Sequence, residues 1–518
     1  MQSKRDQVQA HTFAMGRLTS GMLLADPDAP ESPLARTNRG TVIGLVLAVI
    51  IAAGAAVYGL VSPGGNTSWR TSGTLIVNRD TGGRYLYLDG RLRPVRNYAS
   101  ALLIGGRKLK TTDVRTASLR GTPVGTPVGI PGAPDSVPVA KELDGGAWQV
   151  CSALGRPAGT AATGETAVTT LVAGAPVDGR AMAAGQGVVV AGPDKISYLV
   201  WQGSRLRLDT ASGAAVSLGY GSVTPRPVSA AFLNSLAPGT DLAPPAVPGR
   251  GTAGPSLGDV RSTVGRVYVV RVPGSAPKYY LLQKEGLEPL TATGAALVLG
   301  DPATRESAYA GHSPEAETLG ADVLGKHLSP GEGTKPAASE ALPDSPPRAV
   351  GVPEGMALCA HVGSVDGLVR ISTVLTPSGS LTPVAQATPG ESAEACLPVD
   401  AVVVRPGRGA LVRALGAGGT AVGDTTYFVA ENGVKYRVPS GAALKALGYT
   451  DSDVVKLPSP LLSMLRSGPD LDPGAAAAGG IPATTPPVCG KTAGESGPSP
   501  ATGKASGETG KPPSPEAG

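Results

Sequence analysis

A run of uncharged, largely apolar residues from Thr41 to Val61 (TVIGLVLAVIIAAGAAVYGLV) constrains this chain more than any other feature. A helix of roughly 20 such residues crosses the hydrocarbon core of a bilayer. Residues 1–40 are too long for the n-region of a secretory signal, and no A-x-A-like cleavage site follows the run. The sequence therefore predicts a membrane anchor with a small N-terminal segment and a large C-terminal one.

The orientation of this anchor rests on the cysteines, because the flanking basic residues are almost balanced between the two sides. All the cysteines (Cys151, Cys359, Cys396 and Cys489) follow the run, and none forms a C-x-x-C pair. An even number of spaced cysteines favours disulfides in an oxidising compartment. The alternative, free thiols in a cytosolic body, stays open. We expect a single-pass plasma-membrane protein with a cytoplasmic N-terminus and its bulk outside the cytoplasm.

The composition indicates several small units in the outer body. The 73 glycines and 49 prolines together make 122 of 518 residues, a share close to that of loop-rich sequences. The C-terminal segment is too long for one hydrophobic core, so it should divide into small β-rich domains. The net charge of +5 is modest for this length, which argues against a nucleic-acid partner.

A repeat is visible in the outer body. Its pattern is an aromatic start, a short β-run, a glycine turn, a second β-run and a helix of small residues. The copies are YLYLDGRLRPVRNYASALLIGG from Tyr85, YLVWQGSRLRLDTASGAAVSLGY from Tyr198, YYLLQKEGLEPLTATGAALVLG from Tyr279 and YFVAENGVKYRVPSGAALKALGY from Tyr427. The turn glycines are Gly90, Gly203, Gly286 and Gly433. We expect each to adopt a positive φ, and Ser212, Thr293 and Ser440 to cap the helices that follow.

The spacing of the turn glycines predicts a discontinuous central domain. The steps are 113, 83 and 147 residues, so the first and third gaps must hold inserted sequence. Each insert contains strand-like runs and cysteine. A Cys151–Cys359 bond would join the two inserts into one domain flanked by the repeats. Pairing of Cys359 with its nearer neighbour Cys396 is the open alternative.

The expected fold is therefore a single-pass membrane protein with an α+β, mostly β, extracytoplasmic body. Four small β-hairpin/helix repeat domains surround the discontinuous central β-rich domain. The boundaries are 1–40 for the cytoplasmic N-terminal segment, 41–61 for the transmembrane helix, 69–112 for repeat 1, 113–185 for the first insert of the central domain, 186–250 for repeat 2, 260–328 for repeat 3, 348–420 for the second insert of the central domain, 421–473 for repeat 4 and 474–518 for a disordered tail.

Motifs for chemistry are scarce. The histidines are scattered without metal-ligand spacing, and neither H-E-x-x-H nor G-x-S-x-G occurs. The P-loop lookalike Thr485–Thr492 (TPPVCGKT) has two prolines where a phosphate cradle needs backbone N–H groups. We therefore nominate no catalytic, cofactor-binding or metal-binding residue and expect no cofactor.

Several segments together resemble the EccB component of type VII (ESX) secretion systems. They are the Q-x-x-A-H-x-F-x-x-x-R-L pattern of Gln7–Leu18, the Pro33–Arg36 approach to the span, GTPVGTPVGIPGAPD from Gly121 and VVVRPGRGALVRA from Val402. The resemblance implies four repeats around a central domain held by a disulfide, with Cys151 and Cys359 as the matching pair. Cys396 and Cys489 would then join the tail to the domain edge.

The resemblance also implies partners and a function. We expect a structural subunit of the type VII secretion membrane complex, homo-oligomeric and assembled with EccC-, EccD- and EccE-type membrane subunits. The first alternative is an ATPase, as members of the family are often named, although this sequence offers no intact nucleotide motif. The second is a peptidoglycan-binding anchor, because the repeats resemble wall-binding modules of phage lysins.

Overall fold

The computed structural model describes residues 3–25, 33–61, 67–155, 165–258, 261–329, 342–365, 368–381, 392–416, 421–480 and 489. The chain divides into two compact units. The first contains residues 1–94 and 110–125, and the second contains residues 95–109 and 126–518. The expectations for most of the tail and for the P-loop lookalike lie outside the described residues.

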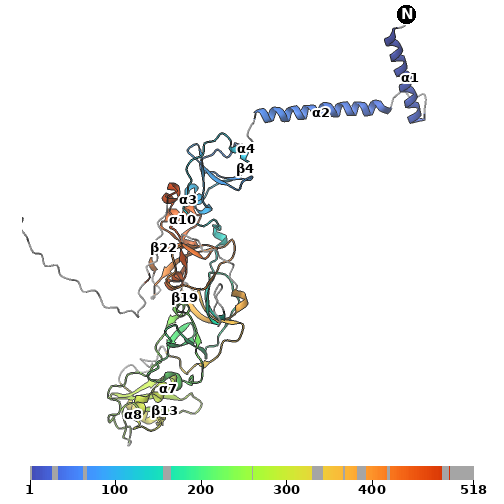
Figure 1. Ribbon diagram of the computed structural model, residues 1–518. Coiled ribbons are helices and arrows are strands. Elements are labelled where there is room, and N and C mark those ends of the chain that lie inside the picture. The colour runs from blue at the N-terminus through green and yellow to red at the C-terminus, as the bar shows by residue number, and fades with distance from the viewer. Residues whose placement is uncertain are drawn as a thin grey trace, which may run out of the picture. The chain divides into compact units, whose positions relative to one another are not determined.

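The N-terminal region is helical (Figure 1). Helix α1 spans Lys4–Leu24, and its first turn is closed by a capping box between Ser3 and Asp6. Helix α2 spans Pro33–Val61. Its segment Thr37–Gly59 is the one described stretch long and apolar enough to cross a membrane, and none of it is buried within the protein. The single predicted membrane helix is confirmed, with a helical start several residues before Thr41.

Four small sheets repeat one topology. A first strand pairs antiparallel with a second, which pairs antiparallel with a third. After a helix, a fourth strand returns parallel to the first. A last segment runs parallel to the third, as strand β12 or β25 or as a single bridge at Val124 or Leu328. The predicted four hairpin/helix repeats are therefore confirmed.

The elements of the first two repeats are as follows. Repeat 1 has β1 Leu75–Asn78, β2 Arg84–Leu88, β3 Arg91–Pro94, α3 Tyr98–Gly105, β4 Thr111–Val114 and α4 Thr116–Leu119. Repeat 2 has β8 Gln186–Ala191, β9 Ser197–Trp201, β10 Ser204–Arg207, α5 Ala214–Ser217, β11 Arg226–Pro227, α6 Ala230–Ser235 and β12 Ala237–Pro238, and β17 Arg348–Ala349 pairs with β8.

The other two repeats contain additional short helices. Repeat 3 has β13 Val267–Val270, β14 Lys278–Gln283, β15 Gly286–Leu290, α7 Ala292–Gly300, α8 Pro302–Ala308, β16 Glu317–Thr318 and α9 Ala321–His327. Repeat 4 has β21 Ala410–Leu415, β22 Ala421–Val429, β23 Val434–Val438, α10 Gly441–Ala446, η3 Asp451–Asp453, β24 Val455–Pro458, α11 Ser459–Ser463, β25 Arg466–Ser467 and α12 Pro473–Ala478.

All four turn glycines adopt a positive φ, as the hairpins require. The angles are +74° at Gly90, +79° at Gly203, +138° at Gly286 and +72° at Gly433. In repeats 1 and 2 the residue before the glycine is also left-handed, at Asp89 (+49°) and Gln202 (+44°). Two successive positive φ values define the type I′ turn that matches the twist of paired strands.

The helix-capping prediction is right at one of three positions. Ser440 caps α10 by accepting a hydrogen bond from the Ala443 N–H at 3.1 Å. In repeat 3 the helix begins earlier, so Thr291 is the cap and accepts from the Gly294 N–H at 3.0 Å, whereas Thr293 is buried inside α7. In repeat 2 the Asp209 carboxylate, not Ser212, accepts the free backbone N–H groups before α5.

The helices join the repeats in pairs. Helix α3 of repeat 1 packs against α10 of repeat 4, and α5 of repeat 2 packs against α7 of repeat 3. Figure 1 shows α3 and α10, from distant regions of the sequence, side by side. The second helices of repeats 2 and 4, α6 and α11, also contact each other. The first helices of the repeats are therefore buried against one another in pairs.

The central sheet contains strands from both inserts. Its order is β20-β6-β5-β18-β19-β7. The first insert supplies β5 Trp148–Gly155, β6 Thr166–Val172 and β7 Arg180–Ala181, with η1 Ala140–Glu142 before them. The second supplies β18 Met356–Val365, β19 Leu368–Pro377, η2 Ser378–Leu381 and β20 Ala401–Val403. The predicted discontinuous central domain is confirmed.

One face of the central sheet explains why repeats 2 and 4 have similar second helices. Side chains such as Trp148, Val150 and Leu358 share a buried cluster with Phe232 of α6 and Leu461 of α11. A helix that covers a sheet must present an apolar stripe to it. In repeat 3, by contrast, α9 has no buried residue. The apolar continuation from Pro227 and from Pro460 therefore marks the two repeats that support the central domain.

Candidate functional site in the central domain

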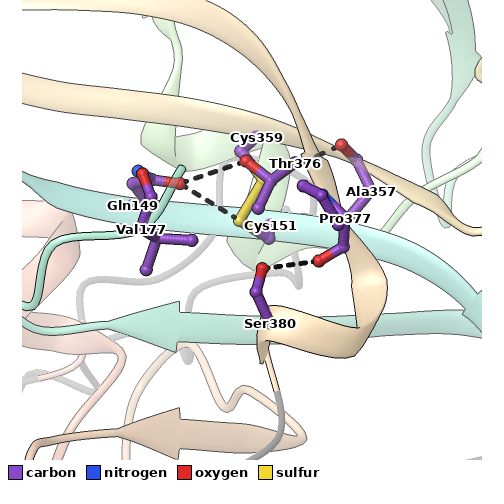
Figure 2. Close-up of a disulfide and its surroundings, with 8 residues drawn as sticks. All are labelled: Gln149, Cys151, Val177, Ala357, Cys359, Thr376, Pro377 and Ser380. Atoms are coloured by element: carbon purple, nitrogen blue, oxygen red, sulfur yellow. Dashed lines mark hydrogen bonds between the residues drawn. A yellow bond between two sulfur atoms is a disulfide. The ribbon is translucent and has the colours of Figure 1, made fainter. Parts of the chain in front are cut away.

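A disulfide links the two inserts at the middle of the central sheet. Cys151 on β5 lies directly opposite Cys359 on β18 in an antiparallel register, and their Sγ atoms are bonded. Both side chains are almost wholly buried, at 1% and 0% exposure. Figure 2 shows the bond between the two strands. It lies on the sheet face opposite the one that α6 and α11 cover, since strand side chains alternate between faces.

Gln149 organises the polar side of this face. Its Oε1 accepts a hydrogen bond from Thr376 Oγ1 at 3.4 Å, and its Nε2 donates to the Val177 carbonyl at 3.3 Å (Figure 2). The second bond holds the segment after β6 over the sheet. The apolar cluster on this face is small and contains Cys151, Val172 and Cys359 among its members. A covalent bond therefore reinforces the face that has less apolar surface to bury.

A second disulfide joins Cys396 to Cys489, with Cα atoms 5.3 Å apart. Cys396 is half-buried and Cys489 is exposed. The segment around Cys396 is fixed to repeat 4, because Ala393 pairs with Ser467 and the Leu397 N–H donates to the Ser463 carbonyl at 3.0 Å. This bond therefore links Cys489, beyond α12, to the segment that pairs with Ser467 of repeat 4.

A cleft of about 430 Å³ opens beside Gln149. Its walls are the segments before β5 and after β6, together with His361 of β18 and the turn that contains Arg405 and Arg408. Burial lowers the pKa of His361, so this imidazole is neutral at pH 7. The cleft combines small residues with a few polar groups, and no Phe, Tyr or Trp side chain lines it.

The ion pair of Asp144 and Arg405 forms one wall of this cleft. Arg405 Nε donates to Asp144 Oδ2 at 3.1 Å, and Nη2 donates to the other carboxylate oxygen. The Asp144 side chain is 1% exposed, whereas that of Arg405 is 41% exposed. The hydrogen bond to Asp144 raises the pKa of Arg405 above its ordinary value. The Asp144 N–H also donates to the Gly409 carbonyl at 2.7 Å, so the central domain is pinned to the strand that opens repeat 4.

The chemical content of the described residues is mainly structural. Among them, no group of three or more His, Cys, Asp or Glu side chains is placed to hold a metal ion. Of the P-loop lookalike only Cys489 is described, and its sulfur is bonded to Cys396. The arrangement holds the inserts and repeats together through two disulfides and the ion pair between buried Asp144 and partly exposed Arg405.

A comparison with protein families decides the affiliation of the chain. Residues 1–483 match the family described as "Type VII secretion system ESX-1, transport TM domain B" (EccB). The chain belongs to the EccB family. It is 28% identical to "ESX-3 secretion system ATPase EccB3" of Mycolicibacterium smegmatis, over 91% of this chain and 89% of that one. It is also 28% identical to "ESX-1 secretion system ATPase EccB1" of Mycobacterium tuberculosis, over 91% and 93% of the two chains.

Solved structures show the same fold. A chain of an intact ESX-5 inner membrane complex matches with a TM-score of 0.60 at 23% identity, over 94% of this chain and 97% of that one. A chain of the periplasmic assembly of an ESX-5 complex matches with a TM-score of 0.60 at 25% identity, over 83% and 99%. An EccB3 dimer from an ESX-3 core complex matches with the same score at 24% identity, over 78% and 99%.

The motifs that carried the resemblance have clear places in this EccB-family fold. Of the stretch from Gly121 to Asp135, residues 126–135 include the contacts with helix α3, where the Ile130 N–H donates to Ser100 Oγ at 2.9 Å. The stretch from Val402 to Ala414 runs from β20 past Arg405 into β21. Sequence reasoning missed the partner of Arg405, because Asp144 lies 261 residues away and no local pattern marks it.

Proposed function

We propose that this chain is a structural subunit of a type VII secretion membrane complex. The observation that carries the proposal is the family match over residues 1–483, which includes the membrane helix and the whole folded outer body. The chain's own features agree with a scaffold: one spanning helix, and an outer body whose distant segments are fastened by disulfides. The N-terminal segment lies on the cytoplasmic side, and the disulfide-bonded body lies outside.

The partners follow from the same proposal. Relatives with this fold occur in an ESX-5 inner membrane complex, in its periplasmic assembly and as an EccB3 dimer. We infer that this chain also associates with its own copies and with EccC-, EccD- and EccE-type membrane subunits. The membrane helix is fully available for such contacts, because none of it is buried within the chain.

An ATPase is the second candidate, and the names of the relatives favour it. A nucleotide site needs backbone N–H groups and cations that converge on phosphates. The cleft beside Gln149 contains Arg405 and Arg408, but Asp144 and Glu142 already pair with them. We therefore place the structural role first.

A peptidoglycan anchor is the remaining alternative from the repeat pattern. The packing of the repeats indicates instead that their helices bind one another, since α3 packs against α10 and α5 packs against α7. Helix faces that contact another repeat are not open to a wall polymer. Peptidoglycan contact would then be made by other surfaces, alongside the scaffold role.

Deletion of this chain from cells, followed by its re-expression, tests the proposed function. Cells that lack this chain should stop exporting the substrates of the system, and their EccC-, EccD- and EccE-type subunits should no longer migrate as one large complex on a native gel. The full chain should restore both, and so should Lys491→Ala, which changes the P-loop lookalike. If the other subunits assembled and exported normally without this chain, the proposal would fail.

A further inference from the structure

Repeat 1, the repeat that follows the membrane helix, carries an excess of positive charge. Residues 67–94 and 110–125, its part of the first compact unit, contain eight basic and three acidic side chains. We call these residues the basic repeat. Its net charge of +5 equals that of the whole chain, so the charges of all other residues cancel. The basic side chains are those of Arg70, Arg79, Arg84, Arg91, Arg93, Lys110, Arg115 and Arg120.

The repeat fold does not require this charge. Repeat 3 has the same strand order, with β15-β14-β13-β16 in place of β3-β2-β1-β4. Residues 261–328 of repeat 3 nevertheless contain seven basic and seven acidic side chains. The excess is therefore a property of the surface of repeat 1, and a positively charged surface favours a negatively charged partner.

The basic side chains of this repeat are accessible. All of them occupy exposed positions except that of Arg93, which is half-buried. On β3, Arg91 and Arg93 alternate with Leu92, which is buried in the core of the repeat. By the register of β2 and β3, Arg84 lies on the same sheet face as these two arginines. This face therefore presents cations from two neighbouring strands.

The carboxylates of the basic repeat are too few to neutralise it. Asp113 pairs with Arg79 at 3.4 Å, and both side chains are largely exposed. Asp80 accepts a hydrogen bond from the Thr116 N–H at 2.8 Å, and Asp89 stands in the hairpin turn. Even if each carboxylate paired with one cation, five positive charges would remain. Exposed ion pairs are also weak, so an external anion competes well with them.

The covalent chain keeps the basic repeat close to the bilayer. Helix α2 ends at Val61, and Thr67 of the repeat follows six residues later. Six residues span at most about 22 Å. The polar headgroup layer adds about 5–8 Å to each side of the hydrocarbon core. The repeat therefore cannot leave the vicinity of the headgroups, which face it at a high effective concentration.

We propose that the basic repeat binds the outer surface of its own membrane through anionic lipid headgroups. Its arginines donate paired hydrogen bonds to lipid phosphates, a geometry that the guanidinium fork matches. The negative potential of the lipid surface attracts these cations within a Debye length, about 8 Å at physiological ionic strength. The contact fixes the base of the outer body on the bilayer. It depends on the membrane helix and not on the secretion role, so the two proposals fail separately.

Chemical modification of arginine on the full chain tests the contact. The chain is placed in nanodiscs of phosphatidylcholine alone, or of equal parts phosphatidylcholine and phosphatidylglycerol. Phenylglyoxal, an uncharged reagent, is added, and mass spectrometry gives the modification rate of each arginine. We expect Arg84, Arg91 and Arg120 to react at least about threefold more slowly in the anionic nanodiscs. Arg271 of repeat 3 should react equally in both. Salt at about 1 M, where the Debye length is about 3 Å, should remove the protection.

Charge reversal provides a matched comparison. Arg91→Glu, Lys110→Glu and Arg120→Glu together change the net charge of the basic repeat from +5 to −1 and should abolish the protection of Arg84. The control changes the charge of the chain by the same amount at three exposed positions of repeat 3 and should leave that protection intact: Arg271→Glu, Lys278→Glu and Lys326→Glu. Glutamine at the three positions of repeat 1 is the milder variant in case the reversed chain does not fold, and it should weaken the protection.

Three results would overturn the proposal. The first is an equal modification rate of the repeat 1 arginines in neutral and anionic nanodiscs. The second is protection that persists in the charge-reversed chain. The third is protection of these arginines in native membranes but not in anionic nanodiscs, which would assign the surface to an acidic protein instead of lipid.

Discussion

Cys151 and Cys359 face each other across neighbouring strands although 208 residues separate them in the chain. All of repeats 2 and 3 lies between them. Each strand of this pair comes from a different insert, so the sheet forms only after a very long loop has closed. Closing a loop of that length in the unfolded chain corresponds to about 5 kcal/mol in the entropy model. The bond thus compensates for the discontinuity of the central domain.

The first prediction concerns this bond. Replacing Cys151 and Cys359 together by Ser should lower the free energy of unfolding of the outer body by about 2–5 kcal/mol, measured by denaturant titration. Replacing Cys396 and Cys489 together should change it by less than about 1 kcal/mol, because that bond fixes a peripheral segment. Non-reducing peptide mapping of the unmodified chain should return 151–359 and 396–489. A 359–396 link would contradict this account.

The second prediction concerns the turn glycine of repeat 2. Gly203 combines a φ of +79° with a close approach to the central domain, since a Cβ there would stand 2.1 Å from the Ile371 carbonyl oxygen. Gly203→Ala should therefore cost at least about 3 kcal/mol of unfolding free energy.

Gly90→Ala is the matched control for this change. Gly90 has nearly the same φ, +74°, but no atom within 4 Å of its would-be Cβ. It should cost only about 1–2 kcal/mol, which is the strain of the left-handed backbone alone. Equal losses in the two variants would show that the contact with Ile371 contributes nothing.

The third prediction is a pH dependence. Lys435 is buried in repeat 4, where its Nζ donates to the Leu462 carbonyl, and burial lowers its pKa from 10.5 to about 8. Between about pH 8 and 10.5 the unfolded chain therefore binds more protons at this residue than the folded chain. The contribution of Lys435 to stability should rise with pH across that window and stay constant below it.

Lys435→Met isolates this contribution. The difference in unfolding free energy, wild type minus Met variant, should increase by up to about 3 kcal/mol from pH 7.5 to pH 10. Thermal or denaturant unfolding of both proteins at each pH gives this difference and cancels the titration of other groups. A difference that is flat or falls with pH would contradict this account, because it would mean that burial does not lower the pKa of Lys435 in the folded chain.

The fourth prediction compares two ion pairs. Asp144→Asn should destabilise the body by about 1–3 kcal/mol, because it weakens the charge-assisted hydrogen bonds from Arg405, whose own side chain is 41% exposed and stays partly solvated. Asp451→Asn removes the partner of Arg413 at a carboxylate that is 80% exposed, and it should change stability by less than about 1 kcal/mol. Similar losses for both would contradict a structural role of the Asp144–Arg405 pair.

The sequence carried the architecture where local patterns are strong. The membrane helix follows from one apolar run, and the repeats follow from tyrosines and turn glycines such as Gly203. The discontinuous domain follows from uneven spacing of those glycines. Prediction from local sequence patterns failed where tertiary contacts decide at which residue a helix begins. Thr293 matches the capping pattern, yet α7 begins before it and Thr291 is the cap. Helix α12 consists of Pro473, Gly474 and four alanines, most of them in the stretch expected to be a disordered tail, and it is ordered by burial against α3.

The candidate site was only partly visible in the sequence. The cysteines could be named because a cysteine stands out in any sequence, but nothing local marks Gln149 or Asp144. Their importance comes from partners that lie 227 and 261 residues away, Thr376 and Arg405. Long-range pairs of ordinary polar residues leave no signal in one sequence.

Purification of the complex from native membranes tests the central claim most directly. The full chain, tagged at its cytoplasmic N-terminus, is extracted in mild detergent, isolated and analysed by native mass measurement and peptide sequencing. We predict one large assembly that contains several copies of this chain with the EccC-, EccD- and EccE-type subunits. Recovery of the chain as a free monomer, with those subunits assembled in a separate complex, would contradict the account.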